Sequence, residues 1–143
     1  MTMTRQEIET LFARRDQAHR LHDAAALVAL YAEDTVVESP TAGGTVRGRK
    51  ALEDVTRAWF TGLPDVTFTR ADLLIDDDRV VWIGDVRGTD TGGFMGLAPT
   101  GKPFRLPMVM VSTVKDGAIV HEQRIYDFTG MLLQIGLLKT KSI

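Results

Sequence analysis

Apolar residues recur every three or four positions from residue 5 to 22, a spacing that predicts an amphipathic helix. The Thr-x-x-Glu pattern that starts at Thr4 is a capping box and marks where this helix begins. Asp23 is suited to cap a second, short helix over residues 24–32. A third apolar stripe predicts a helix over residues 49–63. Helices therefore dominate the N-terminal part of the chain.

Alternation of apolar and polar residues replaces the helical spacing after residue 66 and predicts long strands. Helices followed by strands predict an α+β fold, in which helices pack on one face of an antiparallel sheet, as a single domain of residues 1–143. The glycine-rich stretch 39–48 is expected to form a mobile loop beside a cleft. The expected strands are 35–38, 66–75, 79–92, 102–114 and 118–127, and a last helix is expected near 131–138.

The composition excludes several classes of protein. Seventeen basic and 19 acidic side chains give a net charge of −2, so no overall positive field attracts nucleic acid. The chain has no cysteine, which rules out disulfides, thiolate metal sites and a cysteine nucleophile. The N-terminal residues lack the pattern of a secretory signal, and no run of about 18 apolar residues could span a bilayer. We therefore expect a soluble, cytoplasmic protein.

The last two strands are predicted to form a hairpin whose register follows from its turn. A two-residue turn at Asp116-Gly117 places Lys115 opposite Ala118 and fixes every pair further along. One face then combines apolar side chains with a few polar groups, as expected of a pocket for an apolar ligand. That face holds Leu106, Met108, Met110, Ser112, Val114, Ile119, His121, Gln123, Ile125 and Asp127.

The opposite face of the hairpin carries Glu122 and Arg124 among mainly apolar residues. These two side chains are two positions apart on one strand, so they share a side and are placed to pair. A largely apolar outer face predicts that a second copy of the chain covers it, giving a homodimer.

Several motifs indicate a family. They are the glycine-rich segment Gly88–Lys102, the strand IVHEQRIYD and the ending GMLLQIG. Over nearly its whole length, the chain resembles the SnoaL-like polyketide cyclases, a branch of the nuclear transport factor 2-like (NTF2-like) proteins. The resemblance implies a cone-shaped α+β barrel, with three helices packed on a curved antiparallel sheet around an apolar cavity, and a dimer. It also implies intramolecular aldol condensation of a polyketide without a metal or organic cofactor.

The resemblance assigns acid and base catalysis to an aspartate near the end of the last strand, which is the position of Asp127. Aldol chemistry needs a carboxylate whose pKa is raised by apolar surroundings, because it removes a proton next to a carbonyl. The alternative role of Asp127 is to cap the following helix. Two histidines typical of the family are absent, since Asp90 stands at one position and residues 108–114 contain none.

We therefore predict a cofactor-independent cyclase or isomerase that acts on an apolar, carbonyl-bearing small molecule. Asp127 is the expected acid and base, and Gln123 is the expected orienting group. A non-catalytic small-molecule-binding protein of the same fold is the alternative. The expected substrate contacts are Gln123, Met108, Met110, Leu106, Ile125, Phe94, Trp59 and Asp90.

A third possibility is an epoxide hydrolase of the limonene epoxide hydrolase type, a family that bridges two aspartates by an arginine to activate water. Asp85 and Arg87 alternate on one strand and, with Asp127, supply the same residue types in a different order. Alternatively, Asp85 and Arg87 form a solvated pair. The three aspartates 76–78 lie between two strands, where a solvated turn explains them without a metal ion.

Overall fold

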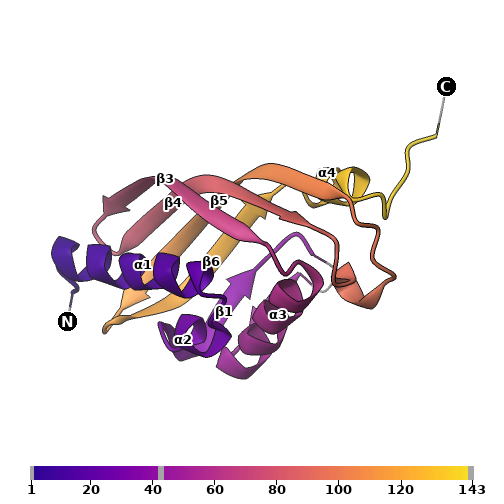
Figure 1. The fold of residues 1–143 in the computed structure, drawn as a ribbon. Coiled ribbons are helices and arrows are strands. Elements are labelled where there is room, and N and C mark those ends of the chain that lie inside the picture. Colours follow the sequence, from indigo (N-terminus) through magenta and orange to yellow (C-terminus); the bar gives the residue numbers. More distant parts are fainter. Residues whose placement is uncertain (1, 42–43, 142–143) are drawn as a thin grey trace.

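The computed structural model describes residues 2–41 and 44–141, which form one sheet and the helices that pack on it (Figure 1). Within these residues, no helix is long and apolar enough to cross a membrane. Residues 42–43 of the loop that was expected to be mobile lie outside the described part. The helices are α1 (Arg5–Arg20), α2 (Ala24–Val28), α3 (Arg49–Gly62) and α4 (Phe128–Gln134), with a 3-10 turn η1 (Phe94–Gly96). The strands are β1 (Tyr31–Glu38), β2 (Thr45–Arg47), β3 (Thr67–Asp76), β4 (Arg79–Thr89), β5 (Pro103–Lys115) and β6 (Ala118–Tyr126).

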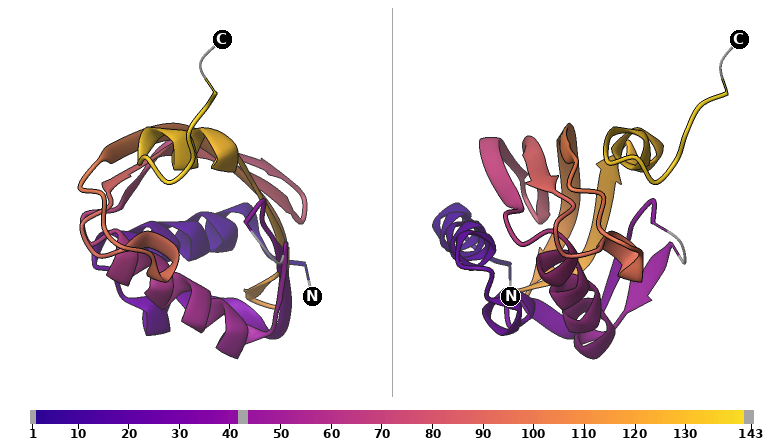
Figure 2. Two further views of the ribbon diagram at one scale, coloured as in Figure 1. Left: turned by 90° about the vertical axis from the view of Figure 1, so that its right-hand side faces the viewer. Right: turned by 45° about the vertical axis from the view of Figure 1, so that its right-hand side comes forward.

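The six strands form one mixed sheet in the order β2-β1-β6-β5-β4-β3. The β1 and β6 strands are parallel, and every other neighbouring pair is antiparallel. The sheet curls around α1, α2 and α3, which lie on its concave side (Figure 2). The predicted α+β fold with three helices on a curved sheet is therefore confirmed. The parallel pair was not predicted, and it arises because β1 enters the sheet beside the last strand of the chain.

Capping residues determine where the first two helices begin. The Thr4 hydroxyl accepts a hydrogen bond from the Glu7 amide, and the Glu7 carboxylate accepts one from the Thr4 amide, which confirms the capping box. Asp23 caps α2 as predicted. This helix ends one turn earlier than predicted, because Tyr31 begins β1 and is fully buried in the sheet.

Two apolar clusters fill the space between the helices and the sheet. One cluster includes Phe12 of α1 and Leu27 of α2, and the other includes Met108 and Met110 of β5. The second cluster also holds the fully buried Trp82, whose indole N–H donates a 3.0 Å hydrogen bond to an Asp16 carboxylate oxygen.

A β-bulge in the β5–β6 hairpin decides which side chains of β6 face the helices. Lys115 pairs with Ala118, as predicted. The register then shifts by one residue at Val120, which is an extra residue on β6. Because side chains alternate along a strand, this extra residue turns the rest of β6 over. The predicted pairing beyond the bulge is therefore wrong.

The bulge exchanges the two faces of β6 but leaves those of β5 as predicted. On β5, the predicted inner residues Leu106, Met108, Met110, Ser112 and Val114 are all buried. On β6, the residues on the helix side are Glu122, Arg124 and Tyr126, and those on the outer side are His121, Gln123 and Ile125.

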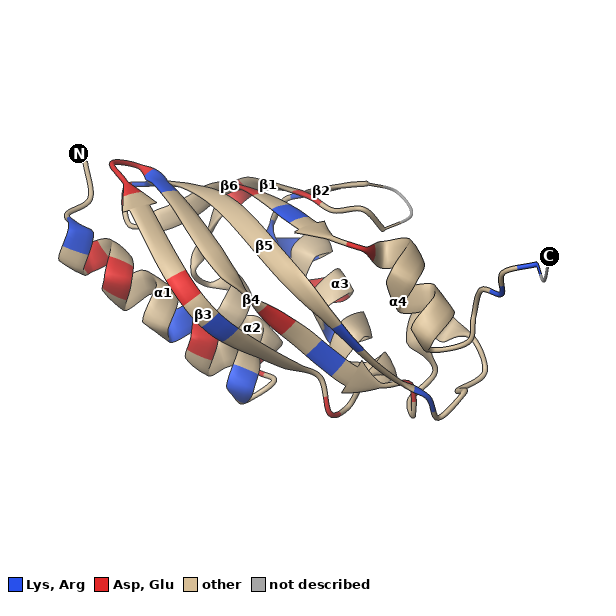
Figure 3. Cartoon of the chain, turned by 90° about the horizontal axis from the view of Figure 1, so that it is seen from above, with Lys and Arg blue, Asp and Glu red and all other residues tan. Residues whose placement is uncertain are grey.

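Charged residues lie along β3 and β4, whereas most of β5 carries none (Figure 3). Ile125 of β6 is half exposed on the outer side of the sheet, with 49% of its surface accessible. The homodimer through this face remains a prediction.

Candidate functional site

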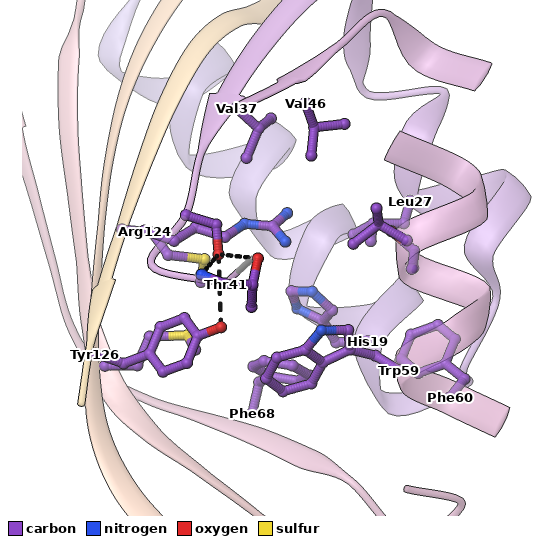
Figure 4. Close-up of a pocket in the computed structure, with 15 residues that line it drawn as sticks. His19, Leu27, Val37, Thr41, Val46, Trp59, Phe60, Phe68, Arg124 and Tyr126 are labelled. Atoms are coloured by element: carbon purple, nitrogen blue, oxygen red, sulfur yellow. Dashed lines mark hydrogen bonds between the residues drawn. The ribbon is translucent and has the colours of Figure 1, made fainter. Parts of the chain in front are cut away.

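A pocket lies between α1, α3 and the concave face of the sheet, where the two apolar clusters meet (Figure 4). Trp59 and Phe60 of α3 and Phe68 of β3 form one wall, and Met108 and Met110 of β5 form another. The cavity has a volume of about 40 Å³. Pockets that hold a drug-sized ligand measure about 300–1,000 Å³, so a ligand of that size requires side chains such as Trp59 to move.

Polar side chains enter the apolar wall from α1, from the loop after β1 and from β6. They include His19, Ser39, Thr41, Arg124 and Tyr126, and Figure 4 shows the His19 ring, the Arg124 guanidinium and the Tyr126 hydroxyl around one space. The Tyr126 hydroxyl lies 3.5 Å from the Ser39 hydroxyl, which lies 3.3 Å from that of Thr41. Among the described residues, no aspartate or glutamate lines the pocket.

Glu122 lies behind this wall, fully buried, and receives hydrogen bonds from four elements. The Arg15 guanidinium of α1 pairs with its Oε1, and the Ser112 hydroxyl of β5 lies 3.1 Å from the same oxygen. The Tyr31 hydroxyl of β1 lies 2.9 Å from both carboxylate oxygens. Arg124 Nε donates to Oε2 at 2.8 Å from within β6 itself. Two guanidinium groups thus share one carboxylate.

The charges of this cluster are fixed by their mutual contacts. Burial disfavours the charged form of Glu122, but Arg15 and Arg124 outweigh burial and lower the pKa of Glu122 to about 2. Burial also disfavours the charge on Arg124, and Glu122 overcomes this effect and raises the pKa of Arg124. Burial raises the pKa of Tyr31, so its hydroxyl stays protonated. The cluster therefore carries one net positive charge at neutral pH.

His19 is the neutral nitrogen base of the pocket. Its ring stacks on Phe68 with centroids 4.3 Å apart, and only 5% of its surface is exposed. Its Nδ1 is buried and has no hydrogen-bond partner among the described residues. Burial, and then the charges of Arg15 and Arg124, hold the pKa of His19 well below its usual value. The imidazole is therefore neutral at pH 7.

Comparison with known proteins places the chain in a family. A model of the SnoaL-like polyketide cyclases matches residues 9–135. The chain belongs to this family. IdmH, a candidate polyketide cyclase from Streptomyces antibioticus, has 32% sequence identity to it, with 90% of this chain and 97% of IdmH covered and a TM-score of 0.75.

Two further solved structures share the SnoaL-like fold. A candidate SnoaL-like polyketide cyclase from Jannaschia sp. CCS1 is 16% identical, covers 97% of this chain and 99% of its own, and has a TM-score of 0.81. A protein with a ketosteroid isomerase-like fold from Catenulispora acidiphila, solved in complex with trimethylamine, is 21% identical, covers 92% and 97%, and has a TM-score of 0.77. A comparison with curated protein sequences finds no match.

In this SnoaL-like chain, only some of the predicted substrate contacts line the pocket. Trp59, Met108 and Met110 do so. Leu106 is buried in the adjoining core, and Phe94 packs edge-on against Trp59, with ring centroids 5.4 Å apart. Leu106 and Phe94 therefore pack behind the residues that line the pocket.

Asp90 organises the glycine-rich loop. Its carboxylate is fully buried and accepts hydrogen bonds from the Phe94 amide at 2.8 Å and from the Thr100 amide and hydroxyl at 3.1 Å. These contacts fold residues 90–100 over the C-terminal end of α3, where the Gly92 amide bonds to the Gly62 carbonyl. Asp90 therefore positions Phe94 behind the pocket and does not line the pocket itself.

The predicted catalytic and orienting residues Asp127 and Gln123 lie outside the pocket. Gln123 and Ile125 are exposed on the outer side of β6, because the bulge turns that strand over. Asp127 is exposed and accepts a 2.8 Å hydrogen bond from the Gly130 amide as the N-cap of α4, which confirms the capping alternative. Asp127 therefore lies outside the apolar pocket, and the catalytic assignment loses its geometric basis.

The residues considered for epoxide hydrolysis also lie away from the pocket. Asp85 pairs with Arg105 at 2.7 Å, and Arg87 donates to the Thr67 hydroxyl at 3.3 Å. Asp76 ends β3, and Asp77 and Asp78 form the turn that leads to β4. The described residues contain no group of His, Asp and Glu side chains that could hold a metal ion. No described acid therefore takes the place of Asp127 in the pocket.

The sequence interpretation missed the residues that give the pocket its chemistry. Arg15 and His19 occupy apolar-stripe positions of α1 in the series Ile8, Leu11, Phe12, Arg15, Ala18 and His19, all of which are buried. A charged residue within an apolar stripe is a signal of a buried polar cluster, since isolated buried charges are costly. That signal was available from the sequence, although the partner Glu122 was not.

Proposed function

We propose that the protein is a cofactor-independent cyclase or isomerase that acts on an apolar, carbonyl-bearing small molecule in this pocket. His19 is the proposed proton acceptor, in place of Asp127. Arg124 and Tyr126 are the proposed donors to the carbonyl oxygen. The observation that carries the proposal is the convergence of a neutral, unpartnered imidazole, a guanidinium and a hydroxyl on one apolar space.

The reaction begins with transfer of a proton from the carbon next to the carbonyl to a ring nitrogen of His19. The electron pair of that C–H bond moves into the enolate, whose oxygen accepts hydrogen bonds from Arg124 and Tyr126. In a cyclase, the enolate carbon then attacks a second carbonyl of the same molecule, and the new alkoxide takes the proton back. In an isomerase, the proton returns to a different carbon of the enolate.

The electrostatics of the pocket suit this cycle. The positive charges of Arg15 and Arg124 disfavour the imidazolium of His19 while the pocket is empty. A negative enolate beside Arg124 offsets that effect, so the proton transfer creates a stabilised ion pair in apolar surroundings. A positioned general base of this kind contributes about 10²- to 10⁴-fold to the rate.

The second candidate function is non-catalytic binding of a small molecule. The observation that favours it is that the wall has no carboxylate among its described residues. Binding without proton transfer is then the expected behaviour, and an assay of proton exchange distinguishes the two functions.

The test follows exchange of the acidic C–H protons of 2-tetralone, an apolar bicyclic ketone, for deuterium in D₂O by proton NMR. We expect the wild-type protein to accelerate exchange over buffer, and His19→Gln to return the rate to that of buffer. The matched control is His121→Gln, because His121 lies on the outer side of β6, where it contacts Glu38 at 3.0 Å. Saturable binding of 2-tetralone without accelerated exchange would contradict the cyclase and isomerase proposal and favour the binding function.

A further inference from the structure

The pocket wall contains a positive charge that the protein does not fully neutralise. Arg15 and Glu122 have no exposed side-chain surface, and Arg124 has 17% exposed side-chain surface on the pocket side. Figure 4 shows the Arg124 guanidinium directed into the space near the His19 ring. One carboxylate therefore faces two guanidinium groups. Arg124 is the one exposed to the pocket, so its guanidinium is the cation that a ligand contacts.

The elements packed around Arg124 supply no second negative charge. From α1 it faces Arg15 and the neutral His19, and from β1 it faces the Tyr31 hydroxyl, which stays protonated. The pocket side of α3 contributes only uncharged side chains, including Trp59. The nearby carboxylate of Asp16 in α1 is paired with Arg70 at 3.1 Å and with the Trp82 indole. Within the described residues, the counter-charge for Arg124 is Glu122 alone.

The contacts of Arg124 leave donors directed at the pocket. Its Nε donates to Glu122, and its guanidinium lies near the Tyr31 hydroxyl. The Tyr31 hydroxyl is itself used by Glu122, so it cannot turn away to serve a ligand. Glu122 thus holds the Nε side of the guanidinium, and the remaining terminal N–H groups have no other described partner. A guanidinium held in this way presents the planar fork that matches two oxygens of an anion.

We propose that the ligand of this pocket is an anion, formed by an apolar body that carries a delocalised pair of oxygens which the Arg124 guanidinium binds. The matching groups are a carboxylate and the ionised enol of a 1,3-dicarbonyl compound. This proposal rests on the pocket named under the proposed function and narrows its substrate class. When the ligand is bound, its negative charge and that of Glu122 balance the positive charges of Arg15 and Arg124.

The consequence for a 1,3-dicarbonyl ligand is a change in its ionisation. A positive charge held in apolar surroundings favours the enolate over the neutral enol, so binding lowers the pKa of the ligand. The ultraviolet spectrum of the bound compound therefore shifts towards that of its enolate at a pH where the free compound is neutral.

The experiment compares three probes of one size by isothermal titration calorimetry at pH 7. They are 3-phenylpropionate, its neutral analogue 3-phenylpropanamide, and 1-phenyl-1,3-butanedione, whose spectrum is also recorded. We expect one of the two acidic probes to bind at least tenfold more tightly than the amide. A preference for 3-phenylpropionate identifies the carboxylate, and tighter binding of the diketone with the enolate spectrum identifies the enolate.

The variant Arg124→Gln tests the residue, because glutamine keeps a donor for Glu122, which retains Arg15, Tyr31 and Ser112. We expect this variant to bind the amide and the acidic probes with equal affinity. The matched control is Arg105→Gln, which removes the same charge from an arginine whose side chain is 69% exposed and paired with Asp85. It is expected to keep the wild-type preference.

Equal binding of the acidic probes and the amide by the wild type, or no saturable binding of either acidic probe, would overturn the proposal. A preference for an acid that persists in Arg124→Gln would also overturn it. Binding is measured here without turnover, so a failure of the proton-exchange assay with 2-tetralone leaves this result intact. Each assay therefore tests one proposal independently of the other.

Discussion

Arg124 Nε donates a 2.8 Å hydrogen bond to Glu122 Oε2, and both side chains lie on the helix side of β6. The pair is completed from α1 by Arg15, whose guanidinium contacts the other oxygen of Glu122. Glu122 therefore contributes both to the packing of the core and to the arrangement of the polar groups in the pocket. The same carboxylate that anchors α1 to the sheet also holds Arg124 at the pocket.

Replacing Glu122 by glutamine is expected to lower the free energy of unfolding by about 3–5 kcal/mol, since it leaves two buried guanidinium groups without a counter-charge. Urea denaturation of the wild type and the variant measures the difference. The control is Glu38→Gln, which removes an exposed carboxylate paired with His121 and should cost less than about 1 kcal/mol. A loss in Glu122→Gln no larger than in the control would show that the buried cluster does not stabilise the fold.

Acid is expected to destabilise the protein through Glu122. Its pKa is about 2 in the folded protein, against about 4.3 for an unfolded glutamate. Because the folded pKa is lowered, the contribution is complete above about pH 5 and is lost as the pH falls towards 2. Thermal unfolding between pH 6 and 2 should show this loss in the wild type. A Glu122→Gln variant whose unfolding temperature declines just as steeply would contradict the assignment.

The capping residues and the strand alternation could be predicted from the sequence because they depend on near neighbours. Thr4 and Asp23 act within three residues of themselves, and the turn at Asp116-Gly117 sets the first pair of the hairpin. The bulge at Val120 could not be predicted in this way. The bulge turns Glu122 to the helix side, where it contacts Arg15, a residue 107 positions away in the chain. Local patterns contain no information on such a contact.

The bulge also affected the candidate site, because Gln123 and Ile125 were assigned to the wrong face of β6. The inner residues of β5 were predicted correctly, because they lie on the strand without the extra residue. On β6, the same extra residue moved Gln123 and Ile125 outward and brought Arg124 and Tyr126 into the pocket. One residue of α1 did indicate a buried polar cluster, since the charged Arg15 interrupts an apolar stripe.

His19 is expected to make the free energy of unfolding depend on pH, in a range above that in which Glu122 acts. Its folded pKa lies well below the usual value, because burial and the positive charges of Arg15 and Arg124 outweigh the opposing charge of Glu122. The unfolded chain therefore takes up a proton near pH 6.5 while the folded protein does not, and stability falls as the pH falls from 7 to 5. His19→Gln should remove this part of the slope in denaturant titrations at pH 7, 6 and 5. An unchanged slope would mean that His19 is solvated or already protonated in the folded protein.

Asp127→Ala is expected to cost about 1 kcal/mol of stability, because it removes the hydrogen bond that caps α4. Its proton-exchange rate with 2-tetralone should equal that of the wild type, since Asp127 does not line the pocket. The control is Asp23→Ala, which removes the corresponding cap of α2. Loss of exchange in Asp127→Ala, with Asp23→Ala unaffected, would restore Asp127 as the catalytic acid and base.

The most direct test of the central claim is a crystal structure of the protein with 1-phenyl-1,3-butanedione bound. We predict that the phenyl ring lies against Met108 and Met110, with Trp59 displaced to enlarge the pocket. We also predict that the two oxygens lie within hydrogen-bond distance of the Arg124 guanidinium, with His19 beside the carbon between them. A ligand bound on the outer face of the sheet or beside Asp127, with the pocket unchanged, would contradict the central claim.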